Sequence, residues 1–170
     1  MQSESARMAS AAEARFRIDA PNSKPRAVKV IALDRPSDRV VKRLAQARWN
    51  QASFFTAAAF AGTPKPEAAF SMTGWLSDVA GRTTDLVNEV NEADLVVMVA
   101  TAGETASAAA IIGEACSVKR VNTTGLIIAS AGSSDEALSK TLAQLRPWSL
   151  MLVIASSDDY IADMLVALRA

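Results

Sequence analysis

The chain of 170 residues contains no histidine. This removes Ser–His and Cys–His nucleophile pairs, histidine-ligated metals and the usual general base near neutral pH. Catalysis by Asp, Glu, Lys, Ser or Thr stays open. Cys116 is the only cysteine, which excludes an intrachain disulfide and favours a cytoplasmic protein.

Long apolar runs and an excess of charge of one sign are also missing. No run reaches the roughly 18 apolar residues of a membrane span, so we expect no membrane partner. Lys plus Arg number 18 and Asp plus Glu number 18, so no net field draws the chain to nucleic acid. Aromatic residues make up only 5%, which disfavours base stacking. These absences point towards proteins or small molecules as partners.

The first 24 residues are polar and small, without the continuous apolar stretch of a secretory signal. We interpret 1–24 as a flexible N-terminal arm. The remaining residues, 25–170, are interpreted as a single domain that is long enough to bury its own core.

Apolar runs that suit the buried strands of a parallel sheet alternate with amphipathic segments along the chain. Strands are predicted at 27–33, 94–100, 125–129 and 150–154, with a further apolar run at 52–60. Helices are predicted from Pro36, from Gly103 to about Val118, from Ser133 and at the C-terminal end. Short connections between them indicate right-handed βαβ crossovers. We therefore predict a doubly wound, mainly parallel, Rossmann-like α/β sheet of about five to six strands, flanked by helices in three layers.

Finer assignments rest on capping and turn residues. Ser37 is predicted to cap the first helix, and Ser133 with Glu136 has capping-box spacing for another. The weaker pattern between 61 and 84 predicts a loop at 61–66, a short strand at 70–72, a helical turn at 75–80 and a helix cap at Thr83 and Thr84.

Several short segments follow one another along the chain in the order seen in a known protein family. Ala93-Asp94 opens an apolar strand, and residues 101–110 are Thr-Ala-Gly-Glu-Thr-Ala-Ser-Ala-Ala-Ala. Residues 124–128 are Thr-Gly-Leu-Ile-Ile, and Asp158 follows the last apolar run. This order resembles the second part of the nucleotide-binding domain of the FtsZ/tubulin family, where a strand beginning Ala-Asp leads into a glycine-rich signature and a Thr-Gly-Thr-Gly-Ala-Ala helix start.

The departures from that family matter as much as the matches. Residues 33–36, Leu-Asp-Arg-Pro, supply no glycine where the family has its phosphate loop. Gly103 alone remains of the signature glycines, and Glu104 adds negative charge beside it. The family's acidic catalytic loop would lie beyond Ala170. We therefore expect no GTP hydrolysis and no tubulin-type protofilament, and a guanine nucleotide is the one cofactor that the resemblance suggests.

Candidate ligand-binding residues lie in the loops after the strands, where open α/β sheets bind ligands. They are Thr101, Gly103, Glu104, Thr105, Ser107, Gly132, Ser133 and Asp158. Small polar residues there suit an anion at a helix N-terminus, with Glu104 or Asp158 as an acid–base group. The same residue types also cap helices and turn chains without any ligand. No catalytic or metal-binding residue is assigned.

Two functions remain open from the sequence. The first is a non-catalytic FtsZ/tubulin-like assembly or accessory protein, acting as a homo-oligomer or through a protein partner. The second is a small-molecule or nucleotide-binding protein or enzyme that uses the strand-end loops. Trp49, Trp75 and Trp148 fit either internal packing or a subunit interface, and Cys116 fits the core.

Overall fold

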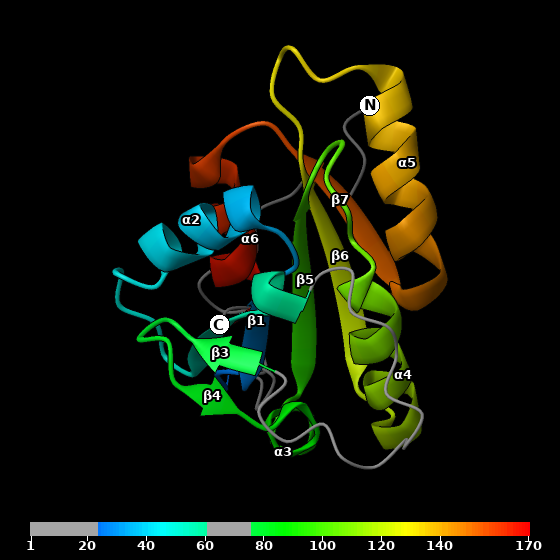
Figure 1. The fold of residues 1–170 in the computed structure, drawn as a ribbon. Coiled ribbons are helices and arrows are strands. Elements are labelled where there is room, and N and C mark those ends of the chain that lie inside the picture. The colour runs from blue at the N-terminus through cyan, green and yellow to red at the C-terminus, as the bar shows by residue number, and fades with distance from the viewer. Residues whose placement is uncertain (1–23, 61–75) are drawn as a thin grey trace, which may run out of the picture.

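The computed structural model describes residues 24–60 and 76–170, whose seven strands form one sheet in the order β4-β3-β2-β1-β5-β6-β7 (Figure 1). The strands are β1 (Val28–Ala32), β2 (Ala52–Thr56), β3 (Leu76–Asp78), β4 (Thr83–Thr84), β5 (Leu95–Thr101), β6 (Asn122–Ile128) and β7 (Met151–Ala155). The helices are α2 (Arg35–Leu44), α3 (Leu86–Asn91), α4 (Ala108–Lys119), α5 (Asp135–Leu145) and α6 (Asp158–Ala167), with 3-10 turns at Ala58–Phe60 and Arg146–Trp148.

The five strands β2-β1-β5-β6-β7 are parallel, whereas β3 and β4 are antiparallel additions at one edge. This confirms the predicted Rossmann-like three-layer α/β class, with seven strands instead of five to six. The order reverses between β1 and β5, which pair directly, Ala32 opposite Val99. The carboxyl ends of these two strands therefore form the switch point at which such folds bind ligands.

Helices cover both faces of the sheet (Figure 1). One core lies under α2 and α6, the other under α3, α4 and α5. Because both faces are covered, the central strands must be apolar on both sides. All five residues of β1 and the first six of β5 are buried. This double covering explains why the central strands were predictable from continuous apolar runs.

Lys29 is a charged residue inside this apolar frame. It lies on β1 with 7% of its surface exposed. Its Nζ donates to Glu89 Oε2 of α3 at 2.8 Å and lies 5.7 Å from the ring centre of Phe55. The ion pair and the aromatic ring offset the desolvation free energy of the buried ammonium group.

The prediction for 76–84 was wrong. Leu76–Asp78 is a strand, not part of a helical turn, and Thr83–Thr84 is its antiparallel partner, not a helix cap. Asp78 Oδ1 accepts from the N–H groups of Ala80 and Arg82, and Gly81 takes φ 81°. The Asp side chain thus builds a turn that closes a hairpin.

Three helix starts also differ from the predictions. Asp34 caps α2, and Ser37 occupies the third helical position of the same capping box. Ser134, not Ser133, caps α5, and α4 begins at Ala108, not at Gly103. At α2 and α5 neighbouring polar residues compete for one cap, and the residue with extended backbone at the helix start, Asp34 or Ser134, accepts from the helix amides.

Trp49 and Trp148 take internal roles, as the packing interpretation predicted. Trp49 Nε1 donates to Leu44 O at 2.7 Å, and its ring lies 5.8 Å from that of Phe54. Trp148 packs against the core beneath α4. The N-terminal arm through residue 23, the loop at 61–66, the strand at 70–72 and Trp75 lie outside the described residues.

Candidate functional site

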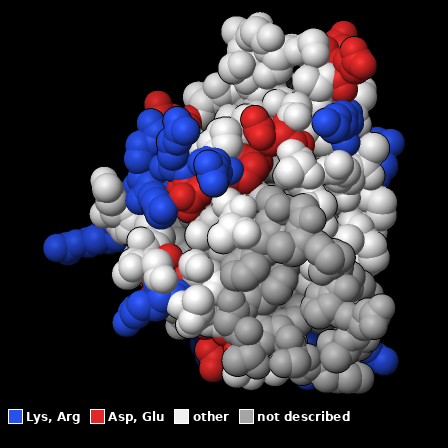
Figure 2. All heavy atoms as spheres, in the orientation of Figure 1, with Lys and Arg blue, Asp and Glu red and all other residues white. Residues whose placement is uncertain are grey.

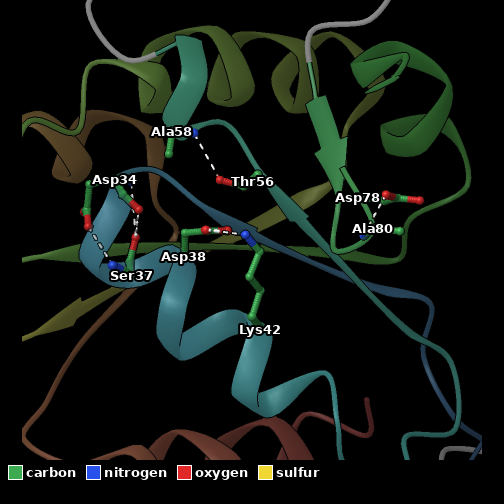
Figure 3. A network of polar contacts seen from close by, with 8 residues as sticks. All are labelled: Asp34, Ser37, Asp38, Lys42, Thr56, Ala58, Asp78 and Ala80. Atoms are coloured by element: carbon green, nitrogen blue, oxygen red, sulfur yellow. Dashed lines mark hydrogen bonds and ion pairs between the residues drawn. The ribbon is translucent and has the colours of Figure 1, made fainter. Parts of the chain in front are cut away.

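A buried carboxylate lies at the switch point between β1 and β5. Asp34, 3% exposed, follows β1. Its Oδ2 accepts from the Thr101 N–H at 2.7 Å and its Oδ1 from the Thr101 hydroxyl at 3.0 Å. Oδ1 also accepts from the Ser37 N–H at 2.8 Å (Figure 3). The Asp34 side chain therefore joins the two strand ends at the place where folds of this class bind a ligand.

Sequence analysis missed this role of Asp34. The available signal was the spacing of Asp34 and Ser37, which is that of a capping box. Ser37 completes the box, because its hydroxyl accepts from the Asp34 N–H at 3.2 Å. The contact to Thr101 joins residues 67 positions apart and has no local signal.

Thr101 ends β5, and the loop that follows it up to α4 carries the candidates Gly103, Glu104, Thr105 and Ser107. Helix α5 holds this loop through contacts to its backbone. The Gly103 N–H is shared between Ala137 O at 3.1 Å and the Thr141 hydroxyl at 3.0 Å. The Glu104 N–H donates to Thr101 O at 3.0 Å.

Two α5 side chains complete this anchoring. Thr141 is fully buried, and Gln144 Oε1 accepts from the Ala106 N–H. A phosphate-binding nest needs backbone N–H groups aimed at the ligand. Here the N–H groups of Gly103, Glu104 and Ala106 already donate within the protein.

Within the loop between β5 and α4, Gly103 is the position that favours glycine. Its φ is 90°, and an added Cβ would lie 3.2 Å from Ala137 Cβ. The backbone thus approaches α5 closely in a conformation that other residues rarely adopt. Packing on α5 explains why a glycine stands at position 103.

Gly132 and Ser133 lie in the next loop, between β6 and α5. The Ser133 hydroxyl lies 3.2 Å from that of Ser130, and the Ser133 N–H donates to Ser130 O at 2.9 Å. An added Cβ at Gly132 would meet nothing within 4 Å. Helix α5 follows this loop and also holds the 101–107 loop, so the structure brings these two groups of candidates to the same helix.

Asp158 belongs to the other face of the sheet. It opens α6, and its Oδ2 lies 2.6 Å from Arg43 Nη2 of α2. The carboxylate is therefore engaged in tying α6 to α2.

The outer edge of β7 forms a second candidate site. Leu150, Met151 and Ile154 are 77%, 41% and 48% exposed. Residues 150–155, Leu-Met-Leu-Val-Ile-Ala, carry no charge and no proline. Within the described ranges no strand pairs with this edge. Natural edge strands are commonly shortened or protected by charge or proline, and this one has neither charge nor proline.

Cys116 is 1% exposed on α4. Burial raises the pKa of its thiol to about 12. A thiol kept protonated in this way is a poor nucleophile, in agreement with its prediction as a core residue.

No protein-family model matches the chain, and no curated protein matches its sequence. No helix in the described ranges has the length and apolar character needed to cross a bilayer. The fold defines a Rossmann-like α/β protein in which Asp34 occupies the switch point and, among the described strands, the apolar edge of β7 is unpaired.

Proposed function

We propose that the protein is a non-catalytic assembly or accessory protein of the cytoplasm, a degenerate FtsZ/tubulin-like domain that works by self-association. The observation that carries this proposal is the open apolar edge of β7. An unpaired strand edge presents a row of N–H and C=O groups that bind another strand.

A second copy fits this edge well. Two β7 strands related by a two-fold axis pair antiparallel, so each residue that donates also meets one that accepts. The absence of charge over 150–155 means that no like charges face each other in such a pair. The two sheets then continue across the subunits, and Met151 and Ile154 become covered.

The strand-end loops support the non-catalytic part of the proposal. Asp34 fills the switch point, and α5 takes the N–H groups of Gly103 and Ala106. A nucleotide would have to displace these internal hydrogen bonds. Each is worth about 0.5–1.5 kcal/mol, or about 1.5–3 kcal/mol where a charge takes part.

The strength of edge pairing can be bounded. Full burial of one large aliphatic side chain contributes about 1.5–3 kcal/mol. Association costs about 4–15 kcal/mol of translational and rotational freedom. A few side chains on one edge therefore predict a weak dimer whose population depends on concentration.

The test is the mass of the protein by size-exclusion chromatography with light scattering over a concentration series. Wild type is expected to gain average mass with concentration. Ile154→Lys is expected to lower the mass at every concentration, since a charge then lies on the pairing edge. Val118→Lys is the matched control, because Val118 is 74% exposed on α4, away from β7. A wild-type monomer at all concentrations would overturn the proposal.

A further inference from the structure

The outward side of α2 is basic. Val40, Val41 and Leu44 face the core, and the opposite side of the helix carries Arg35, Arg39 and Lys42, all exposed. Figure 2 shows Lys and Arg side chains gathered over α2. Lys42 pairs with Asp38 at 2.7 Å (Figure 3). In the described part of the chain no carboxylate lies within ion-pair distance of Arg35 or Arg39.

The outward side of α6 is acidic. Ile161 and Leu165 are buried, and Asp159 and Asp163 lie on the opposite side of the helix and are exposed. Helix α6, Asp158–Ala167, contains no Lys or Arg. Tyr160 and Val166, 51% and 65% exposed, add apolar surface beside the two carboxylates.

The two helices are neighbours on one face of the sheet. Both pack on the same core, and the Arg43–Asp158 ion pair joins them at 2.6 Å. This ion pair joins the last turn of α2 to the first turn of α6. The face they form therefore has a basic half and an acidic half, side by side.

We propose that this face, defined by the outward sides of α2 and α6, is a second self-association surface whose partner is another copy of the chain. The proposal rests on the proposed function and names a surface for it. A two-fold axis that passes between the two helices places α2 of one copy over α6 of the other.

The charges match in spacing along each helix. Arg35 and Arg39 are four residues apart at the start of α2, and Asp159 and Asp163 are four residues apart at the start of α6. Residues with this spacing lie on one side of a helix, one turn apart. The basic pair of one copy therefore faces the acidic pair of the other, and the symmetry repeats this contact.

A second copy suits this face better than an acidic partner does. A polyanion attracted by α2 would be repelled by Asp159 and Asp163 on the adjacent helix. The same chain supplies both halves of the complement, as an isologous interface requires. Combined with the β7 edge, it gives each subunit two different two-fold contacts, which generate a chain of subunits unless the axes close it.

The test uses complementary charge reversal. Variant one is Arg35→Glu with Arg39→Glu, and variant two is Asp159→Arg with Asp163→Arg. Alone, each variant presents like charges across the two-fold and is expected to lose mass relative to wild type at low salt. An equimolar mixture restores opposite charges on both halves and is expected to regain the wild-type mass.

Both variants are made in the Ile154→Lys background as well, so that the β7 edge does not contribute. Ile154→Lys alone is then expected to gain average mass with concentration, the reversed variants to lose this gain, and the mixture to regain it. The control pair is Lys119→Glu with Lys140→Glu, mixed with Glu104→Lys with Glu136→Lys, all exposed residues outside α2 and α6. It carries the same change in charge and is expected to leave mass unchanged.

Three outcomes distinguish a failure of the α2–α6 surface from a failure of the proposed function. Wild type that assembles while both reversed variants assemble equally well overturns this surface and leaves the proposed function standing. A wild-type monomer at all concentrations overturns both. Binding of poly-glutamate that depends on Arg35 and Arg39, with assembly unaffected, replaces the second copy by an acidic partner. Circular dichroism verifies that each variant folds, and Asp163→Arg alone, within the helix, substitutes for the double change if Asp159→Arg disturbs the first turn.

Discussion

Thr101 donates twice to Asp34, through its N–H at 2.7 Å and its hydroxyl at 3.0 Å. The second residue after β1 is thereby joined, through a single carboxylate, to the last residue of β5. The same carboxylate caps α2 through the Ser37 N–H. One buried side chain thus fixes the ends of two central strands and the start of a helix.

Asp34→Asn is expected to lower the free energy of unfolding by about 1.5–3 kcal/mol, the range for hydrogen bonds to a charged group. An amide has one oxygen, so its NH₂ must face a donor that the carboxylate now accepts from. The measurement is urea denaturation. Asp38→Asn, whose partner Lys42 is exposed, is the control and is expected to cost less than about 1 kcal/mol. Equal losses would show that the contact to Thr101 contributes little.

Gly113→Ala tests the packing of α4. Alanine is the better helix former by about 1 kcal/mol, but its Cβ would lie 2.5 Å from Trp148 Cβ and 2.8 Å from Cε3. Overpacking costs about 1–3 kcal/mol, so the variant is expected to be destabilised. Gly132→Ala, with open space around it, is expected to change stability by less than about 1 kcal/mol. A more stable Gly113→Ala in thermal melting would mean that Trp148 moves away freely.

Cys116 predicts a pH dependence at the alkaline end. Burial raises the pKa of its thiol from 9.0 to about 12. Between these values the unfolded chain loses the proton while the native chain keeps it, so the native state binds more protons and stability falls as pH rises. The slope is at most about 1.4 kcal/mol per pH unit.

The measurement compares wild type with Cys116→Ala by urea denaturation from pH 8 to 11. Other groups titrate in both proteins, so the difference between the two curves isolates the thiol. The difference is expected to shrink as pH rises above 9, because only wild type loses stability through this thiol. A difference that stays constant contradicts the buried, protonated thiol, as does rapid labelling of native protein by a thiol reagent at pH 8.

The sequence was most informative where both sides of an element are buried. β5 is apolar up to its last residue and β1 is interrupted only by Lys29, because helices cover both faces of the sheet, and such runs predict a parallel sheet. The hairpin of β3 and β4 escaped prediction because a strand of three residues is too short to show alternation. Its signal was the turn chemistry of Asp78 and Gly81.

The sequence predicted where the candidate loops lie, but not whether their N–H groups are free to bind a ligand. Sequence order places the polar loops at the carboxyl ends of strands, where the structure has them. Whether their N–H groups are free depends on contacts across the fold, such as Gly103 to Thr141, 38 residues apart. The exposure of Ile154 depends likewise on strand order, which no local pattern encodes.

The buried ion pair of Lys29 and Glu89 has a consequence for how the sheet forms. The other residues of β1 are Val, Val, Ile and Ala, which suit either core equally well, so their pattern alone does not decide which side faces α3. A slip of one residue would turn Lys29 towards Val40, Val41 and Leu44 on the opposite face, with the ammonium unpaired among aliphatic side chains. Removing the partner of a buried charge costs about 3–5 kcal/mol. Lys29 therefore specifies the register of β1 against its neighbours, because the register shifted by one residue would be strongly destabilised.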